Sequence, residues 1–351
     1  MRFGIFDHME LTSSTLAELY EERLRMLEYA DAAGFWCYHK AEHHFTPLDA
    51  APSSTVFLAA ASQRTQRIRL GSMVMLLPFY EPLRFVEEIC MLDHLCGGRL
   101  EVGVGKGISP AEHALWGHDP ATARERFEEA FEIVRVGLSE ATPERADPGS
   151  DVLESVTERY RRTGSADGTP QPLHTLQRPR PGFWYPGNVD YAGRHRLHTI
   201  VGGPTRAINR AAEIYRKGLE RPDSDWNPGV AEPTIGVQAH IYLDTTAEAA
   251  VDRVRQAYTV YHRNLTTLWH RYDVPIAEID PTFGGRFDVA MERSALLAGS
   301  PRTAIEYVRR VARETGISYV VFAFGWGDLT HAEIMRSMGL FAEEVMPEFQ
   351  G

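Results

Sequence analysis

The sequence predicts an α/β fold, a (β/α)8 (TIM) barrel formed as a single domain by residues 1–351. Eight short runs of β-branched and aromatic residues alternate with longer segments of helical apolar period, and eight such units close a parallel barrel. No linker of different composition separates two domains. The alternative is an open doubly wound sheet that binds a dinucleotide. It is disfavoured because no G-x-G-x-x-G follows the first run.

The predicted strands share a short length and an enrichment in β-branched or aromatic residues. They are Arg2–Phe6, Phe35–His39, Ile68–Leu76, Leu100–Val104, Phe183–Gly187, His198–Gly203, Thr234–Leu243 and Tyr319–Phe324.

The predicted helices carry start and stop signals. Thr15 and Glu18 form a capping-box pattern, and Gly34 stops the helix that follows. The helix Pro82–Leu95 begins with proline and is followed by two glycines. Further helices are predicted at Ser53–Arg64, Ala121–Leu138 and Thr205–Leu219, from Ser300–Pro301 to Gly316, and at the end of the chain after Thr330 and Glu333.

A long excursion separates the fourth helix from the fifth strand. Residues 140–182 lack periodicity and are rich in Pro, Gly, Arg and Asp. Irregular segments of this length are usually functional or disordered. We therefore predict an irregular insertion, with a lid over the site as one interpretation and disorder or simple packing as the other.

Composition excludes several classes of partner. The formal charge of −11 disfavours binding to nucleic acid or to an anionic membrane surface, and no apolar stretch is long enough to span a bilayer. The chain has three cysteines, without C-x-x-C spacing, and no signal-peptide pattern at the N-terminus. These features predict a cytoplasmic location.

Chemistry in a barrel is expected just after the strands. Glu42, His43 and His44 follow the second strand, and Gly105-Lys106-Gly107 follows the fourth. Adjacent histidines seldom converge on one ion, so no metal is expected. Glycines at several strand ends favour a planar or phosphorylated ligand that approaches the backbone closely.

Several motifs occur in a characteristic order: A-E-H-H-F-T at 41–46, I-R-L-G-S-M-V-M-L-L-P at 68–78, L-D-H-L-C-G-G-R-L at 92–100, V-G-V-G-K-G at 102–107 and Q-R-P-R-P-G-F-W-Y at 177–185. With G-S-P at 299–301 and S-M-G-L-F-A-E-E-V-M-P at 337–347, they cover nearly the whole chain. In these motifs the sequence resembles the bacterial luciferase-like monooxygenases.

The resemblance implies that reduced FMN binds at the C-terminal mouth of the barrel, reacts with O2 and oxygenates a small, mostly apolar organic substrate. It makes His43 the catalytic residue and implies a cis peptide bond at Met73–Val74. Gly187-Asn188 stands where many members have a Ser/Thr-rich phosphate turn. The predicted cofactor contacts are Glu42, Met73, Val74, Gly105, Lys106, Gly107, Gly187 and Asn188. The predicted pocket or supporting residues are His44, Met75, Glu112, Trp116, Phe324 and Trp326.

The resemblance also implies partners. A separate flavin reductase would supply reduced FMN, because the chain lacks a dinucleotide signature. The apolar helices Ser53–Arg64 and Pro82–Leu95 predict a homodimer, with a heterodimer as the alternative. Two other functions remain open: an oxidoreductase of the same superfamily that uses coenzyme F420, and a non-catalytic flavin-binding subunit.

Overall fold

The computed structural model describes residues 1–12, 14–138, 173–275 and 286–350. Residues 140–172 of the predicted insertion lie outside these ranges, so the insertion and its role as a lid stay predictions. Residues 173–182 lead into the fifth strand of the barrel.

Eight parallel strands form the wall of the barrel, and each pairs with its neighbours in the ring. They are β1 (Arg2–Asp7), β2 (Cys37–Lys40), β3 (Arg69–Ser72), β5 (Leu100–Gly105), β6 (Gly182–Trp184), β7 (Thr199–Gly202), β8 (Ile235–Leu243) and β10 (Tyr319–Ala323).

The ring closes between β6 and β7 through a single parallel bridge, Trp184 to His198. The Tyr185 N–H donates to the His198 carbonyl at 2.8 Å, and the His198 N–H donates to the Phe183 carbonyl at 3.0 Å. The Asn227 side chain supports this joint, because its Oδ1 accepts from the Phe183 N–H at 2.8 Å and its Nδ2 donates to the Phe183 carbonyl at 3.0 Å. The predicted barrel is confirmed.

Two short strands were not predicted as separate elements. The run expected at Ile68–Leu76 is divided, because the chain turns after β3 and continues as β4 (Met75–Leu76), which pairs with β5. The strand β9 (Leu296–Gly299) pairs with the C-terminal half of β8. The pairing of β8 with β10 ends at His240, but β8 itself continues for three more residues, to Leu243. This extension of β8 gives β9 a strand to pair with.

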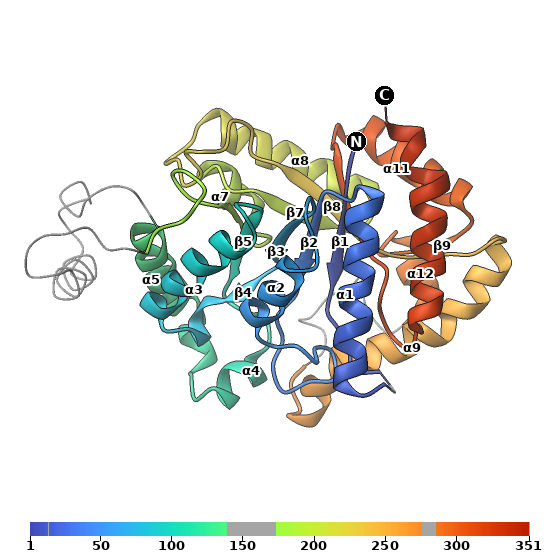
Figure 1. The fold of residues 1–351 in the computed structure, drawn as a ribbon, viewed down its shortest axis with the longest axis horizontal. Helices are drawn as coiled ribbons and strands as arrows, with labels where there is room; N and C mark the ends of the chain where they lie inside the picture. Colours follow the sequence, from blue (N-terminus) through green and yellow to red (C-terminus); the bar gives the residue numbers. More distant parts are fainter. Residues whose placement is uncertain (13, 139–172, 276–285, 351) are drawn as a thin grey trace, which may run out of the picture.

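The helices surround the strands, and both chain ends lie at the same end of the molecule (Figure 1). They are α1 (Leu16–Ala33), α2 (Ser54–Ser62), α3 (Pro82–Leu95), α4 (Pro110–Leu115), α5 (Ala123–Gly137), α7 (Val189–Arg194), α8 (Thr205–Glu220), α9 (Ala247–Arg271), α10 (Phe287–Glu292), α11 (Pro301–Thr315) and α12 (His331–Leu340). Short 3-10 or π turns are η1 (Leu77–Phe79), η2 (Pro120–Thr122), η5 (Phe341–Val345) and η6 (Met346–Phe349).

Helix ends follow the capping signals. Thr15 and Glu18 form the predicted capping box of α1, and Thr330 and Glu333 form that of α12. The glycines that stop α1 and α11, Gly34 and Gly316, have φ values of 89° and 67°, a left-handed conformation that glycine adopts at little cost. These boundaries are confirmed.

Side chains fill the N-terminal part of the barrel. Glu101 is buried there, forms an ion pair with Arg69 and accepts from the Trp184 Nε1–H at 2.6 Å. The His39 ring lies 2.6 Å from the Tyr319 hydroxyl. Because this end of the barrel is packed, a ligand has to approach from the C-terminal ends of the strands.

Candidate active site

A buried ion pair holds the turn after β2 in place. Lys40 Nζ lies 2.8 Å from Asp49 Oδ2, and both side chains are fully buried. The same Asp49 oxygen accepts from the backbone N–H of His43 at 3.0 Å. Breaking such a pair would leave a buried unpaired charge, which costs several kcal/mol. The backbone of His43 is therefore rigidly placed at the mouth of the barrel.

Glu42 connects this turn to the segment around β4. Its Oε2 accepts from the Tyr80 hydroxyl at 2.6 Å, and its Oε1 accepts from the Leu76 N–H at 3.2 Å. Oε1 also lies 3.3 Å from His44 Nε2. Both oxygens of Glu42 have protein partners, and a contact with a cofactor stays a prediction.

His43 faces Glu112, which lies on α4. His43 Nδ1 is 3.4 Å from Glu112 Oε1, and the same oxygen accepts from the His44 N–H at 2.7 Å. Burial lowers the pKa of His43, but the hydrogen bond and charge of Glu112 outweigh it, so the pKa is raised above its usual value. Glu112 Oε2 is buried, and no described residue hydrogen-bonds to it.

Two more histidines lie beside His43. The His8 ring is centred 5.5 Å from that of His43 and 6.4 Å from that of His240, which stacks on it. Burial, together with the charges of His43, His240 and Lys40, lowers the pKa of His8 well below its usual value. Burial lowers the pKa of His240 to about 4. The group therefore contains two neutral imidazoles, those of His8 and His240, and one that is protonated more readily, that of His43.

The segment between β3 and β4 forms a second wall. The peptide bond Met73–Val74 is cis, as the resemblance implies. Val74 lies so close to Gly105 of β5 that a Cβ at this glycine would clash with its side chain. Met73 and Met75 are buried. A side chain at residue 105 would therefore displace the side chain of Val74.

The turns after β5 and β6 contain the predicted phosphate contacts. Lys106 is exposed, and its Nζ donates to the Gly107 carbonyl at 3.2 Å. Gly187 and Asn188 are also exposed, and the Asn188 side chain caps α7. Because β5 and β6 are neighbours in the ring, these groups lie at one edge of the mouth.

The turn after β7 continues this edge. At Gly203 a Cβ would have nothing within 4 Å, so the backbone is open to a ligand. The helix α8 begins two residues later, and free N–H groups at a helix start favour anions. This turn was not among the predicted cofactor contacts, although glycines after a strand and before a helix are the signal that points to it.

Aromatic rings form the rim of the mouth. Trp116 is 43% exposed and stacks on Phe79 with ring centres 5.7 Å apart. The His44 ring packs edge-on against both, at 5.3 and 5.5 Å. His44 therefore belongs to the rim, whereas His43 points to the buried group around Glu112.

The two aromatic residues predicted from the end of the chain lie in different places. Trp326 is buried 5.5 Å from the His240 ring and donates its Nε1–H to the Ile241 carbonyl at 3.2 Å. Phe324 packs against Phe35 and Phe341, away from the histidines. The structure brings Trp326 to the site and does not bring Phe324 there.

Three residues of this group were not predicted: His8, His240 and Tyr261. His8 comes directly after β1, so the reasoning that found His43 also applies to it. His240 lies inside a predicted strand rather than after one. Tyr261 comes from the middle of α9, 4.4 Å from the His240 ring, and no local signal marks it.

Some arrangements are absent from the described parts of the chain. Within residues 1–12, 14–138, 173–275 and 286–350, no group of three or more His, Cys, Asp or Glu side chains is arranged to hold a metal ion. Among the helices that the structure describes, none is both long and apolar enough to cross a membrane.

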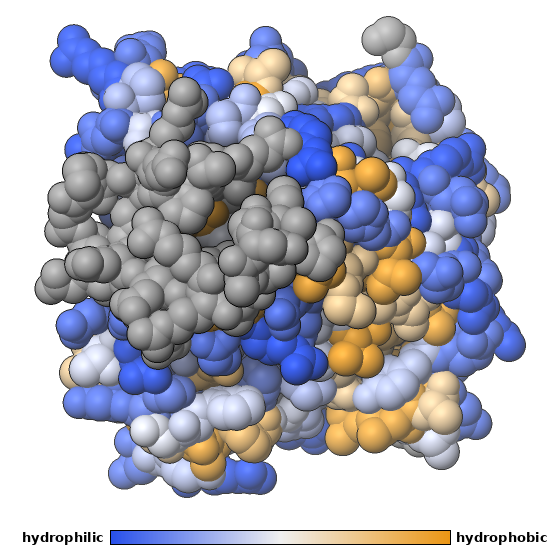
Figure 2. Space-filling model, turned by 60° about the vertical axis from the view of Figure 1, so that its left-hand side comes forward, coloured by the Kyte–Doolittle hydropathy of each residue, from blue (hydrophilic) through white to orange (hydrophobic). Residues whose placement is uncertain are grey.

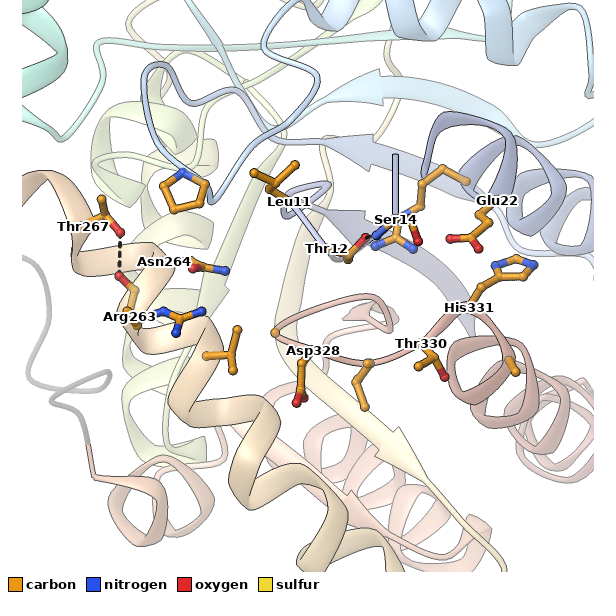
Figure 3. Close-up of a pocket in the computed structure, with 16 residues that line it drawn as sticks. Leu11, Thr12, Ser14, Glu22, Arg263, Asn264, Thr267, Asp328, Thr330 and His331 are labelled. Carbon is orange, nitrogen blue, oxygen red and sulfur yellow. Dashed lines mark hydrogen bonds between the residues drawn. The ribbon is translucent and has the colours of Figure 1, made fainter. Parts of the chain in front are cut away.

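A separate hollow of about 820 Å³ lies beside the mouth. Figure 3 shows Arg263, Asn264 and Thr267 of α9 on one side of it and Glu22 and His331 on the other. None of the predicted site residues lines this hollow.

The chain was compared with known proteins. A family model for luciferase-like monooxygenases matches residues 1–319. The chain belongs to this family. It is 31% identical over 334 residues to the protein y4wF of Sinorhizobium fredii, covering 94% of this chain and 92% of that one. It is 25% identical over 351 residues to limonene 1,2-monooxygenase of Rhodococcus erythropolis, covering 93% and 81%.

Solved structures of luciferase-like proteins share the fold. The monooxygenase RslO1 of Streptomyces bottropensis superposes with a TM-score of 0.78 at 24% identity, covering 99% of this chain and 100% of that one. The oxygenating constituent of 3,6-diketocamphane monooxygenase of Pseudomonas putida, in complex with FMN, gives 0.74 at 17%, covering 99% and 98%. A coenzyme F420-dependent tetrahydromethanopterin reductase of Methanopyrus kandleri gives 0.67 at 18%, covering 99% of both chains.

Proposed function

We propose that this luciferase-like protein uses reduced FMN and O2 to oxygenate a small, mostly apolar organic substrate. The observation that carries the proposal is the pairing of His43 with Glu112 in a buried mouth. Glu112 raises the pKa of His43, while burial and the neighbouring charged groups lower that of His8, so one imidazole of the group is suited to hold a proton.

The residues at the mouth fit FMN. Glu112 Oε2 is buried without a protein hydrogen bond among the described residues, which suits a polar group of a ligand. Lys106 and the open backbone at Gly203 would hold the phosphate, with Gly107, Gly187 and Asn188 on the neighbouring turns. Met73 and Val74 would lie against the flavin ring.

The chain's own contribution is binding, proton handling and the exclusion of water. Reduced FMN, when bound, supplies the reaction with O2. His43 would hold or deliver a proton at Nδ1 or Nε2, while Glu112 orients its ring. Met75, Trp116 and Trp326 would keep the pocket apolar and restrict water.

We further propose two partners and a location. A separate reductase would supply reduced FMN, and the relation to an oxygenating constituent of a diketocamphane monooxygenase supports this. A second copy of this chain would cover α2 and α3. The three cysteines are free and buried, which supports a reducing cytoplasm.

The test is a reaction without a reductase. FMN is photoreduced anaerobically, mixed with the protein and with ¹⁸O2, and offered a panel of terpenes, cyclic ketones and aldehydes. Incorporation of ¹⁸O into a product is expected. Product formation only with reduced F420 would replace the proposal with the F420 alternative, whose support is the likeness to the tetrahydromethanopterin reductase. Flavin binding without turnover with either cofactor would indicate a non-catalytic subunit.

A further inference from the structure

The His8 side chain is buried at the mouth without a protein partner for its ring. Its exposed fraction is 7%, and the described part of the chain offers neither ring nitrogen a hydrogen bond. Its backbone carbonyl accepts from Lys40 Nζ at 3.5 Å. The ring nitrogens of His8 are therefore available to a polar group of a molecule that enters the mouth.

The surroundings of His8 are aromatic. Its ring lies 4.7 Å from that of Phe6, 6.0 Å from that of Tyr261 and 6.4 Å from that of His240. Trp326 continues this wall behind His240. A ligand that touches this wall is apolar over most of its surface.

His8 is also rigidly placed. The residue before it, Asp7, accepts from the Met9 N–H at 2.8 Å and lies 2.9 Å from the buried Arg23 guanidinium. Burial lowers the pKa of His8, so its ring is neutral, with one nitrogen that donates and one that accepts. The groups that face it are His43, His240, Tyr261 and, through its backbone, Lys40.

We propose that His8 hydrogen-bonds to the single oxygen, carbonyl or hydroxyl, of an otherwise apolar substrate, and so selects oxygen-bearing substrates over the hydrocarbons of the same shape. The inference rests on the proposed function, because it takes the mouth to be the substrate site. His43, whose ring is centred 5.5 Å from that of His8, would handle the proton, so His8 would fix which carbon faces the oxygenating group.

Binding measurements test this without turnover. Two series of probes are used, and the members of each series share one carbon skeleton. The first series is limonene, carvone and carveol, and the second is decane, decanal and decanol. Each is titrated by equilibrium dialysis into the full chain with oxidised FMN present. The wild type is expected to bind the ketone, aldehyde or alcohol of at least one series about 10-fold more tightly than the hydrocarbon, the size of one good hydrogen bond. The carbonyl and hydroxyl arms show which oxygen is preferred.

The variants assign the preference to His8. His8→Phe is expected to remove it, and His8→Gln, which keeps a donor and an acceptor, to retain most of it. His8→Leu serves if the phenylalanine variant does not fold, with FMN binding and unfolding midpoint as checks. The matched control is His195→Phe, at the C-terminal end of α7, where the ring hydrogen-bonds to Ser224.

The inference is overturned if the wild type prefers the oxygen-bearing probe in neither series, or if both apolar variants retain the preference. Failure of the proposed function gives a different pattern. In that case the binding preference depends on His8 as expected, but no ¹⁸O enters any product.

Discussion

At the scale of single residues, two adjacent histidines occupy different environments. His43 faces Glu112 and lies 5.5 Å from the His8 ring, inside the mouth. His44 contacts Glu42 and packs against the rim ring of Trp116. The backbone of each is held by a different carboxylate, Asp49 for His43 and Glu112 for His44.

We expect His43→Ala to lower turnover by about 10²–10⁴, the range for a lost general acid or base, while FMN binding and folding remain near wild type. His44→Ala removes packing at the rim and is expected to lower turnover far less. Single-turnover rates with photoreduced FMN measure both. A variant pair in which His44→Ala loses activity and His43→Ala keeps it would contradict the assignment.

Glu10 is a second residue with an unusual environment. It is buried after β1, and its carboxylate accepts from the Gly327 N–H at 2.8 Å and from Asn264 Nδ2 at 2.7 Å. Burial outweighs these hydrogen bonds and raises the pKa of Glu10 to about 7. Because this exceeds the unfolded value, the folded protein holds the proton over a range where the unfolded chain has lost it.

We therefore expect Glu10 to reduce stability as the pH rises. The stability that protonated Glu10 contributes is fully present below about pH 4.5 and is lost as the pH rises to about 7. The free energy of unfolding changes by about 3 kcal/mol over this range. Glu10→Gln removes this loss, although its amide nitrogen cannot accept one of the two N–H groups. Denaturant unfolding between pH 4.5 and 8 measures the free energy of unfolding of variant and wild type. The difference between the two should rise by about 3 kcal/mol over this range.

The same exchange at the exposed Glu232 is the control for Glu10→Gln. If the difference in free energy of unfolding between Glu10→Gln and wild type does not change with pH, Glu10 is ionised throughout the range.

Position relative to a strand could be predicted at the level of residues, whereas the roles of the residues stay predictions. His43 and Lys106 follow predicted strands, and so does His8, which the same reasoning could have found. The Lys40–Asp49 pair could not be predicted, because a fully buried lysine looks like any other strand residue in the sequence. Phe324 and Trp326 lie beyond the end of β10, where the alternation of a strand no longer determines which way a side chain points.

At the scale of elements, local signals were sufficient for most helices. Both ends of α1 and α11 and the start of α12 were predictable because capping depends on residues within one turn. The strands β4 and β9 were not, because each exists through pairing with a distant strand.

The turn after β5 gives a prediction about the cofactor. Lys106→Ala should weaken FMN binding by about 1–2 kcal/mol, because the ammonium would contribute one charge-assisted hydrogen bond to the phosphate. Isothermal titration with FMN measures this. The comparison variant is Lys217→Ala, on α8, which should bind FMN as the wild type does. Equal affinity of both variants would exclude Lys106 from the phosphate site.

At the scale of the whole molecule, apolar side chains gather on one face. Val56 of α2 is 70% exposed, and Met91 and Leu95 of α3 are 55% and 49% exposed. The two helices pack against each other, so these side chains form one surface. Figure 2 shows hydrophobic residues gathered on the face that is turned forward. Such patches are typical of interfaces.

We expect the wild-type protein to have the mass of a dimer at micromolar concentration. The Met91→Asp variant should have the mass of a monomer, because a charge at the centre of an apolar interface is costly to bury. Light scattering measures both. Tyr272→Asp, at a comparably exposed residue after α9, should leave the mass unchanged. A wild type that scatters as a monomer would exclude the interface.

The joint between β6 and β7 has few backbone hydrogen bonds, and this affects where the barrel opens locally in the folded state. One bridge and one asparagine side chain close the ring there, and the Phe183 amide depends on Asn227 for its partner. Cooperative units of a fold exchange their amide protons together, and a joint with few backbone bonds is a natural boundary between two of them. Deuterium uptake at Phe183 and Tyr185 would then report local opening of the barrel next to the turns that are predicted to bind phosphate. A ligand held across both turns would slow that uptake without touching either amide.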